Sequence, residues 1–182
     1  RPMRPLFPKD YRNDVTIDDI VMAVDPECRP ELLAMIGSSV AVSISDIPFD
    51  GPCAMTQIGM VDGEFIVNPS QKQWAEGDLN LTVASVGQKV IMIEAGANEI
   101  PESKMLEAIY KAHEVNLQLI EFIQKIVAEV GKTKSTYTSC AAPQELFDAM
   151  KQIVPPAEME EAVFTDEKQV REDNIVKITD RL

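Results

Sequence analysis

The stretch covering residues 30–96 restricts most strongly what this chain can fold into. It opens with a helical run rich in small residues, RPELLAMIGSSVAVSISD, which ends in a Pro/Gly-rich turn sequence. Four short runs typical of β-strands then follow in quick succession: CAMTQIGMV, EFIVNP, LNLTVASV and KVIMIEAG. One helix followed by a tight set of strands is typical of an α+β layer, in which the helix covers one face of the sheet. We therefore expect an α+β fold organised around this stretch.

Turn residues between these runs predict how the strands connect. Asp62 and Gly63 favour a two-residue hairpin, because a type I′ turn needs positive φ at both central residues. Gly87 and Gln88 predict a second hairpin between the third and fourth runs. The polar residues 70–74 between the two hairpins are compatible with a short helix.

Two further elements are predicted on either side of this layer. Residues 15–24 read as a buried strand, because apolar residues occupy both alternating faces, with a break near Asp18 and Asp19. Pro101 suits a helix start and Gly131 a helix end, which predicts a helix of about 30 residues, roughly 45 Å long. Its apolar stripe comprises Met105, Ile109, Ala112, Leu119, Ile123, Ile126 and Val130.

The C-terminal part of the chain is acidic and helical in pattern. Residues 143–154 predict a short amphipathic helix, and residues 157–182 predict one or two more. The last segment contains too few apolar side chains for a core of its own, so we expect it to dock on the main body or on segments outside this chain. The predicted organisation is a body at 1–131, a polar linker at 132–142 and a helical segment at 143–182.

The charge and the cysteine content limit which binding partners and which cellular compartment we expect for this chain. A net charge of −13 argues by itself against nucleic-acid binding, because such domains are usually basic. Residues 1–12 differ from the rest, because they contain four cations and one carboxylate. Such a basic edge can attract phosphate groups locally. The plainer interpretation is that this end of the chain happens to be basic. Three cysteines without a close pair favour reduced thiols and a cytoplasmic protein. No membrane span or secretory signal is predicted, and the start at Arg1 suggests a piece of a longer protein.

Few residues suggest chemistry on their own. His113 is the only histidine and the cysteines are scattered, so the sequence has no zinc-binding spacing. A lone histidine within a helix more often has a structural role. Gly37, followed by two serines, lacks the other glycines and the lysine of a phosphate loop, which favours helix packing. Asp78 precedes a predicted strand and fits either a turn or a Mg²⁺ ligand, although such a ligand usually has a second carboxylate nearby.

Two long strings carry a family resemblance: AMIGSSVAVSISDIPFDGPCAMTQIGMVDGEFIVNPSQ and MIEAGANEIPE. Together with the flank RPMRPLFP and the helix around His113, they resemble the first RNase-PH-type domain of the bacterial polynucleotide phosphorylase family in order and spacing. The resemblance is strong from Arg1 to about Gly131 and weaker through the acidic tail. It implies an RNase-PH-like mixed sheet covered by helices, followed by a small all-helical acidic segment that matches the family's helical linker.

The resemblance implies an RNA-degrading enzyme whose chemistry lies outside this chain. Family members attack the 3′ end of RNA with inorganic phosphate, release nucleoside diphosphates and also run in reverse; paired aspartates in their second domain bind Mg²⁺. Asp78 matches the downstream aspartate, but Lys72 stands six residues upstream and Asn80 replaces a further carboxylate. We therefore expect no catalytic residue and no metal site here, with Asp78 as a vestigial metal position.

The resemblance also implies RNA handling and ring assembly. In the family, three subunits form a ring whose channel admits single-stranded RNA, and Arg1 and Arg4 match arginines near its constriction. Guanidinium groups bind phosphates in a bidentate way. No aromatic residues that would read bases alternate with these cations. We expect Arg1 and Arg4 to contact RNA, within a cytoplasmic trimer that degrades mRNA, alone or with partners in RNA-degradation complexes.

Two other hypotheses remain at this point. The chain is a purely structural and oligomerisation module without RNA contact, or it is a small-molecule kinase with a similar α/β layer. The kinase hypothesis requires a glycine-rich phosphate loop, which the sequence lacks.

Overall fold

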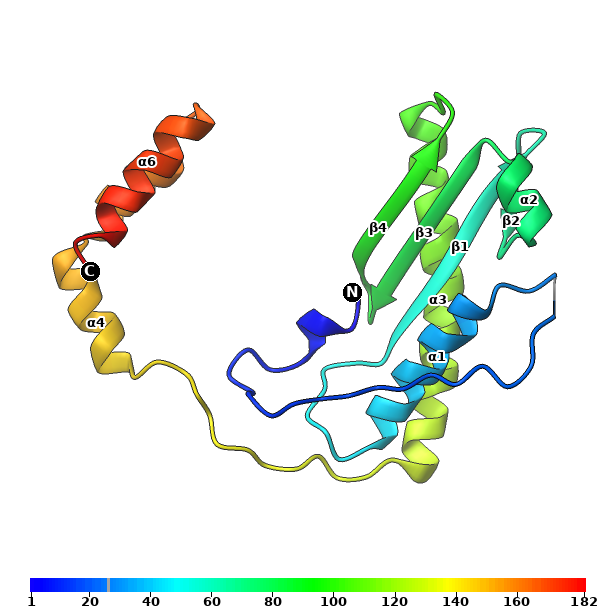
Figure 1. The fold of residues 1–182 in the computed structure, drawn as a ribbon, viewed down its shortest axis with the longest axis horizontal. Helices are drawn as coiled ribbons and strands as arrows, with labels where there is room; N and C mark the ends of the chain where they lie inside the picture. Colours follow the sequence, from blue (N-terminus) through cyan, green and yellow to red (C-terminus); the bar gives the residue numbers. More distant parts are fainter. Residues whose placement is uncertain (26) are drawn as a thin grey trace. The chain divides into compact units, whose positions relative to one another are not determined.

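The computed structural model describes residues 1–25 and 27–182, which fall into two compact units, Arg1–Thr138 and Ser139–Leu182. The elements of the first unit are η1 (Arg4–Leu6, a short 3-10 helix), α1 (Pro30–Ile44), β1 (Cys53–Val61), β2 (Glu64–Val67), α2 (Gln71–Glu76), β3 (Leu79–Val86), β4 (Lys89–Ala97) and α3 (Glu102–Val130) (Figure 1). Those of the second are α4 (Gln144–Ile153), α5 (Pro156–Val163) and α6 (Lys168–Thr179). The predicted α+β class is confirmed.

The described strands form one antiparallel sheet in the order β2-β1-β3-β4. Asp62 and Gly63 have φ of 52° and 80° and join β1 to β2, while Gly87 has φ of 50° between β3 and β4, so both predicted hairpins are confirmed. The resemblance implied a mixed sheet, but these strands pair only antiparallel. Hairpins join β1 to β2 and β3 to β4 directly, and the connection from β2 through α2 brings β3 back beside β1 in the antiparallel direction.

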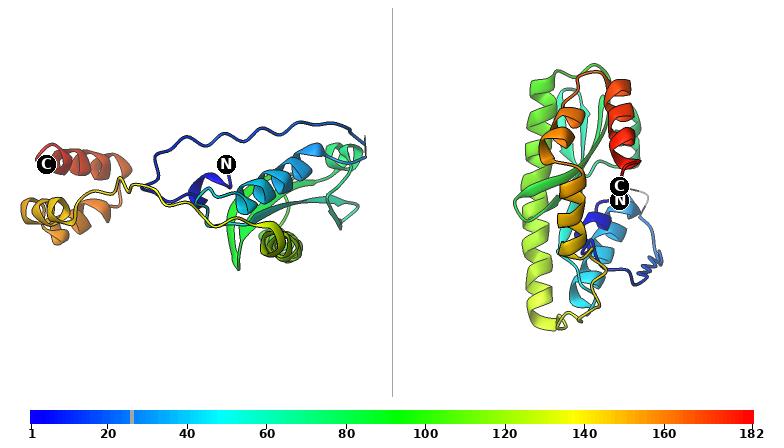
Figure 2. Two further views of the ribbon diagram at one scale, coloured as in Figure 1. Left: turned by 90° about the horizontal axis from the view of Figure 1, so that it is seen from below. Right: turned by 90° about the vertical axis from the view of Figure 1, so that its left-hand side faces the viewer.

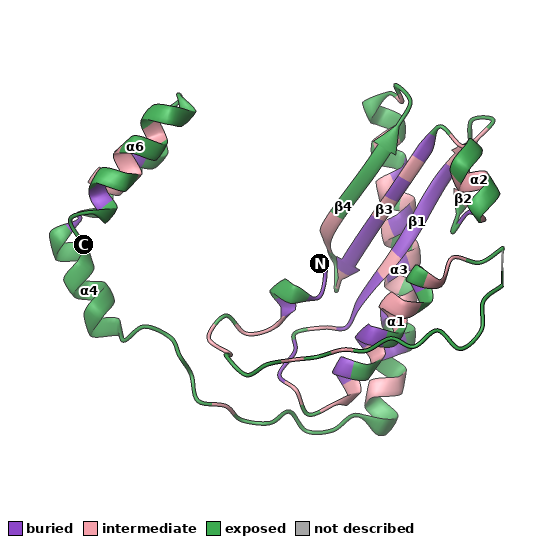
Figure 3. Cartoon of the chain, in the orientation of Figure 1, coloured by how far each residue is buried: buried purple, intermediate pink, exposed green. Residues whose placement is uncertain are grey.

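Helix α3 packs along the sheet and builds the main core. Ile58, Leu81 and Val83 are fully buried in one cluster with Ala108 and Ala112, whose small side chains allow a close approach. Figure 3 shows that much of β1 and β3 is buried. Figure 2 shows α3 nearly end-on beside the sheet. The predicted helix is confirmed, but its stripe is shorter than expected, because Val130 is 59% exposed.

A second core joins the N-terminal segment to α1 and to the start of β1. Met3 and Leu6 are buried against Val42, Phe49 and Cys53. Helix α1 also packs against α3, and the hydroxyl of Ser39 accepts a hydrogen bond from the backbone N–H of Cys53 at 3.0 Å. The serines of α1 therefore serve packing, as predicted.

The predicted strand at residues 15–24 is wrong. This segment is extended but belongs to no strand, and Ile20 and Met22 are 80% and 88% exposed. A β-strand needs a neighbouring backbone for its hydrogen bonds, and no strand pairs with this segment within the described residues. The segment is instead attached to α1 by a hydrogen bond of 2.7 Å from Ser38 Oγ to Asp19 Oδ2.

Residues 132–138 lie on the first unit. Lys134 Nζ donates hydrogen bonds to the carbonyls of Val42, Ser43 and Ser45, at 2.8–3.0 Å, at the C-terminal end of α1. The hydroxyl of Tyr137 donates to Asp10 Oδ1 at 2.8 Å. Residues 132–138 of the predicted linker at 132–142 are therefore held on the first unit by hydrogen bonds.

The second unit has a small core of its own, contrary to the sequence-based expectation. Val154, Ala162 and Ile178 are buried together, because α5 and α6 pack against each other. The apolar stripe of α4 is exposed, with Leu146 and Phe147 at 53% and 51%. No helix in the described parts of the chain is long and apolar enough to cross a membrane.

Candidate nucleic-acid interface

The N-terminal segment holds the two arginines that were predicted to contact RNA. Prolines at positions 2 and 5 stiffen it, and Met3 and Leu6 anchor it in the second core. The rings of Phe7 and Phe49 lie 5.1 Å apart, and the N–H of Asp50 donates to the carbonyl of Leu6 at 2.8 Å. Because the apolar side chains point inward, Arg4 is left on the exposed side of η1.

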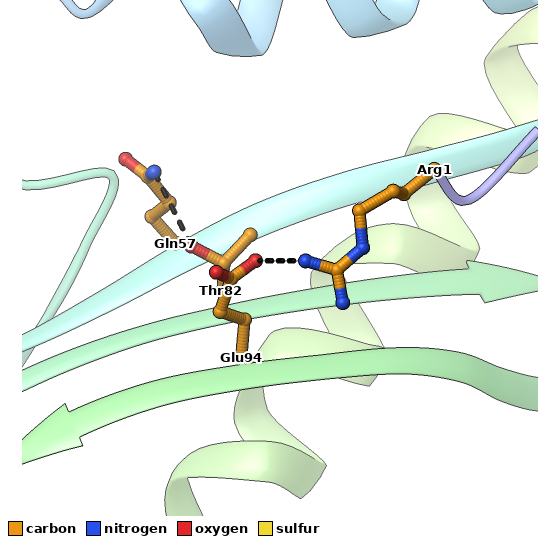
Figure 4. Close-up of polar contacts among 4 residues, drawn as sticks. All are labelled: Arg1, Gln57, Thr82 and Glu94. Atoms are coloured by element: carbon orange, nitrogen blue, oxygen red, sulfur yellow. Dashed lines mark hydrogen bonds and ion pairs between the residues drawn. The ribbon is translucent and has the colours of Figure 1, made fainter.

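Arg1 lies over a polar row that crosses the sheet. Its guanidinium Nη1 lies 3.4 Å from Glu94 Oε2 on β4, and the two side chains are 74% and 63% exposed. Thr82 pairs with Glu94 on one side and with Gln57 on the other, so these residues share one face (Figure 4). Gln57 Nε2 donates to Thr82 Oγ1 at 3.3 Å.

This ion pair contributes little to stability. Exposed pairs are screened by water and are worth at most about 1 kcal/mol. Arg1 is therefore available to exchange Glu94 for a phosphate group, whereas Arg12 already donates to the carbonyls of Lys9 and Tyr11. The segment offers Arg1 and Arg4 as accessible cations on an anchored backbone.

Asp78 lies at a junction between strand ends. Its N–H donates to the carbonyl of Met60, its carbonyl accepts from the N–H of Asn98, and its Oδ1 lies 3.4 Å from Asn98 Nδ2. In the described part of the chain, no three His, Cys, Asp or Glu side chains converge on a point where a metal could bind. These hydrogen bonds hold Asp78 in the turn that precedes β3.

The two residues that were compared with Asp78 lie in different surroundings. Lys72 is exposed on α2, and Asn80 is half-buried on β3. The Oδ1 atom of Asn80 is buried and has no hydrogen-bond partner among the described residues.

His113 has the structural role that was favoured from sequence. Its Nδ1 lies 2.9 Å from Ser85 Oγ on β3, which links α3 to the sheet. Asn116, one turn further along α3, is fully buried and was not singled out by the sequence. It accepts from Thr56 Oγ1 at 2.8 Å and donates to Val83 O and Ser85 Oγ at 3.0 and 3.1 Å.

Sequence reasoning also missed a cation stacked on an aromatic ring. The guanidinium carbon of Arg29 lies 4.3 Å from the ring centroid of Trp74, although the two residues are far apart in the sequence. The only available signal was that Trp74 is the single tryptophan of the chain, in a segment that is otherwise polar.

Known proteins match this chain in both sequence and fold. The family described as 3′ exoribonuclease family, domain 2, matches residues 51–115. Polyribonucleotide nucleotidyltransferase of Lachnoclostridium phytofermentans is 66% identical over 182 residues, and that of Ruminiclostridium cellulolyticum is 46% identical over 180 residues. These alignments cover 100% and 99% of this chain and 26% of each relative, so the chain spans about a quarter of their length.

A solved structure supports the fold assignment. The crystal structure of rice (Oryza sativa) Rrp46 superposes with a TM-score of 0.50 at 12% identity, covering 58% of this chain and 51% of that chain. At this identity the likeness concerns the fold alone. The family match and the two relatives add sequence identity, and on that basis the chain belongs to the polyribonucleotide nucleotidyltransferase family and contains part of its RNase-PH-type fold.

Proposed function

We propose that this chain is the RNA-guiding part of a 3′-to-5′ phosphorolytic exoribonuclease. In the whole enzyme, an oxygen of inorganic phosphate attacks the last phosphodiester of RNA, which releases a nucleoside diphosphate and an RNA shorter by one residue. The reverse reaction extends RNA. The catalytic residues and the Mg²⁺ ion belong to parts of the enzyme outside this chain, and the enzyme acts in the cytoplasm as a ring of three copies.

The observation that carries this proposal is the exposure of Arg1 and Arg4 on an anchored segment. A guanidinium on a stiff backbone loses little conformational entropy when it binds a phosphate. The strongly acidic remainder of the chain repels RNA elsewhere, so contact is favoured at this segment.

Binding of a labelled single-stranded oligoadenylate, measured by fluorescence anisotropy over a range of salt concentrations, tests the RNA role. We expect binding that weakens with salt. In the double variant Arg1→Ala with Arg4→Ala, the salt slope should be smaller by about 0.7 for each RNA phosphate that the two arginines neutralise. A matched control combines Lys125→Ala with Lys168→Ala, which removes the same charge from exposed positions elsewhere. If RNA binding weakens equally in both double variants, the loss comes from the change in net charge and not from the positions of Arg1 and Arg4.

A phosphorolysis assay tests whether the catalytic residues lie outside this chain. This chain, incubated with poly(A), phosphate and Mg²⁺, is expected to release no ADP, while a full-length relative releases it readily. ADP release by the chain that is lost in Asp78→Ala would contradict the proposal and would place a working site here.

A second candidate function is assembly without RNA contact. It is favoured by the exposed apolar residues of α3, among them Leu106, Tyr110 and Phe122, which a neighbouring chain would cover. A defined oligomer in analytical ultracentrifugation, together with no RNA binding at low salt, would support this candidate over RNA guiding.

A further inference from the structure

A pocket of about 400 Å³ lies between the start of α1 and helix α2. Arg29 and Glu31 line it from the beginning of α1, Trp74 lines it from α2, and Asp25 lines it from the segment before α1. Its size is within the range of small-ligand sites. None of these residues belongs to the N-terminal segment that carries Arg1 and Arg4.

Arg29 is the centre of this pocket. Its guanidinium lies over the ring of Trp74 at the distance of a cation–π contact, and its Nη2 donates to Glu31 Oε1 at 2.8 Å. Its other terminal nitrogen, Nη1, is buried and has no acceptor within the described chain. A buried N–H of a charged group without an acceptor is costly, so a movement of the Arg29 side chain that turns Nη1 toward an acceptor on a ligand is favoured.

The charges of the pocket exclude a simple anion site. Glu31 stays ionised because the hydrogen bond from Arg29 lowers the pKa of its carboxyl group. Because Asp25 also lines the pocket, its lining includes two carboxylates and one guanidinium. A phosphate would be repelled, whereas a neutral planar ligand that presents an acceptor beside a donor would satisfy both Arg29 and Glu31.

We propose that this pocket binds a nucleobase of single-stranded RNA, which stacks on the ring of Trp74 beside the Arg29 guanidinium, accepts a hydrogen bond from Arg29 Nη1 and donates one to Glu31. The Watson–Crick edge of each RNA base carries an acceptor next to a donor, which matches this pair of side chains. Base stacking on aromatic and guanidinium planes is the usual way in which unpaired RNA is held, and purines, with the larger ring, stack best. The inference deepens the proposed function, since it adds a base contact to the phosphate contacts of Arg1 and Arg4.

The fluorescence of Trp74 tests this inference, because this residue is the only tryptophan in the chain. Adenosine carries a base without a phosphate, and ribose 5-phosphate carries a phosphate without a base. We expect saturable quenching by adenosine, with excitation at the red edge of the tryptophan band, and none by ribose 5-phosphate. Saturable quenching by ribose 5-phosphate, or no response to adenosine in a chain that is folded by circular dichroism, would overturn the inference.

Single substitutions test which side chains of the pocket contact the base. Arg29→Gln should weaken adenosine binding about tenfold, as for the removal of one charge-assisted hydrogen bond and one stacking cation. Glu31→Gln should weaken it less, and the remote charge change Lys125→Gln should leave it unaltered. Adenosine binding of full strength in a folded Arg29→Gln chain would exclude Arg29 from the site.

Failure of the base pocket and failure of RNA guiding give different experimental results. In the chain with Arg1→Ala and Arg4→Ala, we expect salt-dependent RNA binding to weaken while the adenosine response persists. Persistent adenosine quenching with no RNA binding in the unaltered chain would refute both RNA guiding and the assignment of the base to RNA, and would leave a site for a free nucleoside. RNA binding without adenosine quenching would refute the pocket alone.

Discussion

The two faces of the sheet satisfy their polar groups differently. On the face toward α3, Asn116 is fully buried and its amide donates and accepts three hydrogen bonds. On the opposite face, Gln57 is 5% exposed and Asn80 is half-buried, yet the side-chain oxygens of both are buried without a partner among the described residues. The first face is completed by contacts within the chain, while the second retains unused hydrogen-bonding capacity beside Arg1 and Glu94.

This difference shows which face is organised for stability. A buried network that is fully paired stiffens the packing of helix on sheet. A buried oxygen without a partner costs free energy instead, so its side chain contributes less to folding. Substitutions at matched positions on the two faces should therefore have unequal effects on stability.

The largest effect is expected at Asn116. Asn116→Ala removes the amide and leaves Thr56, Ser85 and the carbonyl of Val83 without that partner, so the free energy of unfolding should fall by about 3 kcal/mol. Urea denaturation measures the change. The matched control is Gln118→Ala on the exposed side of the same helix, where we expect less than about 0.5 kcal/mol. Equal decreases at both positions would refute the importance of the buried network.

On the face opposite α3, Cys53 is expected to make the stability of the chain depend on pH. Burial raises the pKa of its thiol from 9.0 to about 11, so the folded chain keeps the thiol neutral where the unfolded chain ionises it. The stability that comes from keeping this thiol neutral is fully present below pH 9. The free energy of unfolding then falls by about 2 kcal/mol as the pH rises from 9 toward 11, because only the unfolded chain ionises the thiol.

The measurement is the free energy of unfolding across this alkaline range, for the unaltered chain and for Cys53→Ala. Other groups titrate in the same range, so the difference between the two chains isolates the thiol. If both lose stability in parallel, the raised pKa of Cys53 does not contribute.

A smaller effect is expected at Gln57. Gln57→Met keeps the length of the side chain and removes a buried oxygen that has no partner, so the loss of the bond to Thr82 is largely offset. The free energy of unfolding should change by less than about 1 kcal/mol. A decrease as large as that of Asn116→Ala would mean that the Gln57 oxygen is satisfied in solution, and it would remove the contrast between the faces.

The smallest effect on stability is expected at Glu94. Glu94→Gln breaks an exposed ion pair and should change the free energy of unfolding by less than about 0.5 kcal/mol. If Arg1 binds RNA phosphates, the same variant should strengthen oligoadenylate binding at low salt, because Arg1 loses its competing carboxylate. Unaltered binding would argue against Arg1 as an RNA-binding residue, and Glu121→Gln on α3 is the matched change in charge.

Much of the fold could be predicted because local chemistry specifies it. Asp62, Gly63 and Gly87 adopt the positive φ that their hairpins need, and Pro101 and Gly131 flank α3 as expected. Residues 15–24 show where local pattern fails, since an extended apolar segment becomes a strand only beside another one. The candidate site was less predictable: the family resemblance indicates Arg1 and Arg4, but only the structure shows that Glu94 on β4 forms an ion pair with Arg1.

The sequence by itself determined the elements and their class: the small-residue helix, the two hairpins, the long amphipathic helix and the relation to the 3′ exoribonuclease family. Only the tertiary structure decided which polar groups are satisfied. Asn116 acquires partners from β1 and β3, Gln57 keeps a lone oxygen, and Arg29 meets Trp74 across the gap between α1 and α2. The physical reason is that turn and helix preferences depend on neighbouring residues, whereas hydrogen bonds and stacking join atoms that only packing brings together.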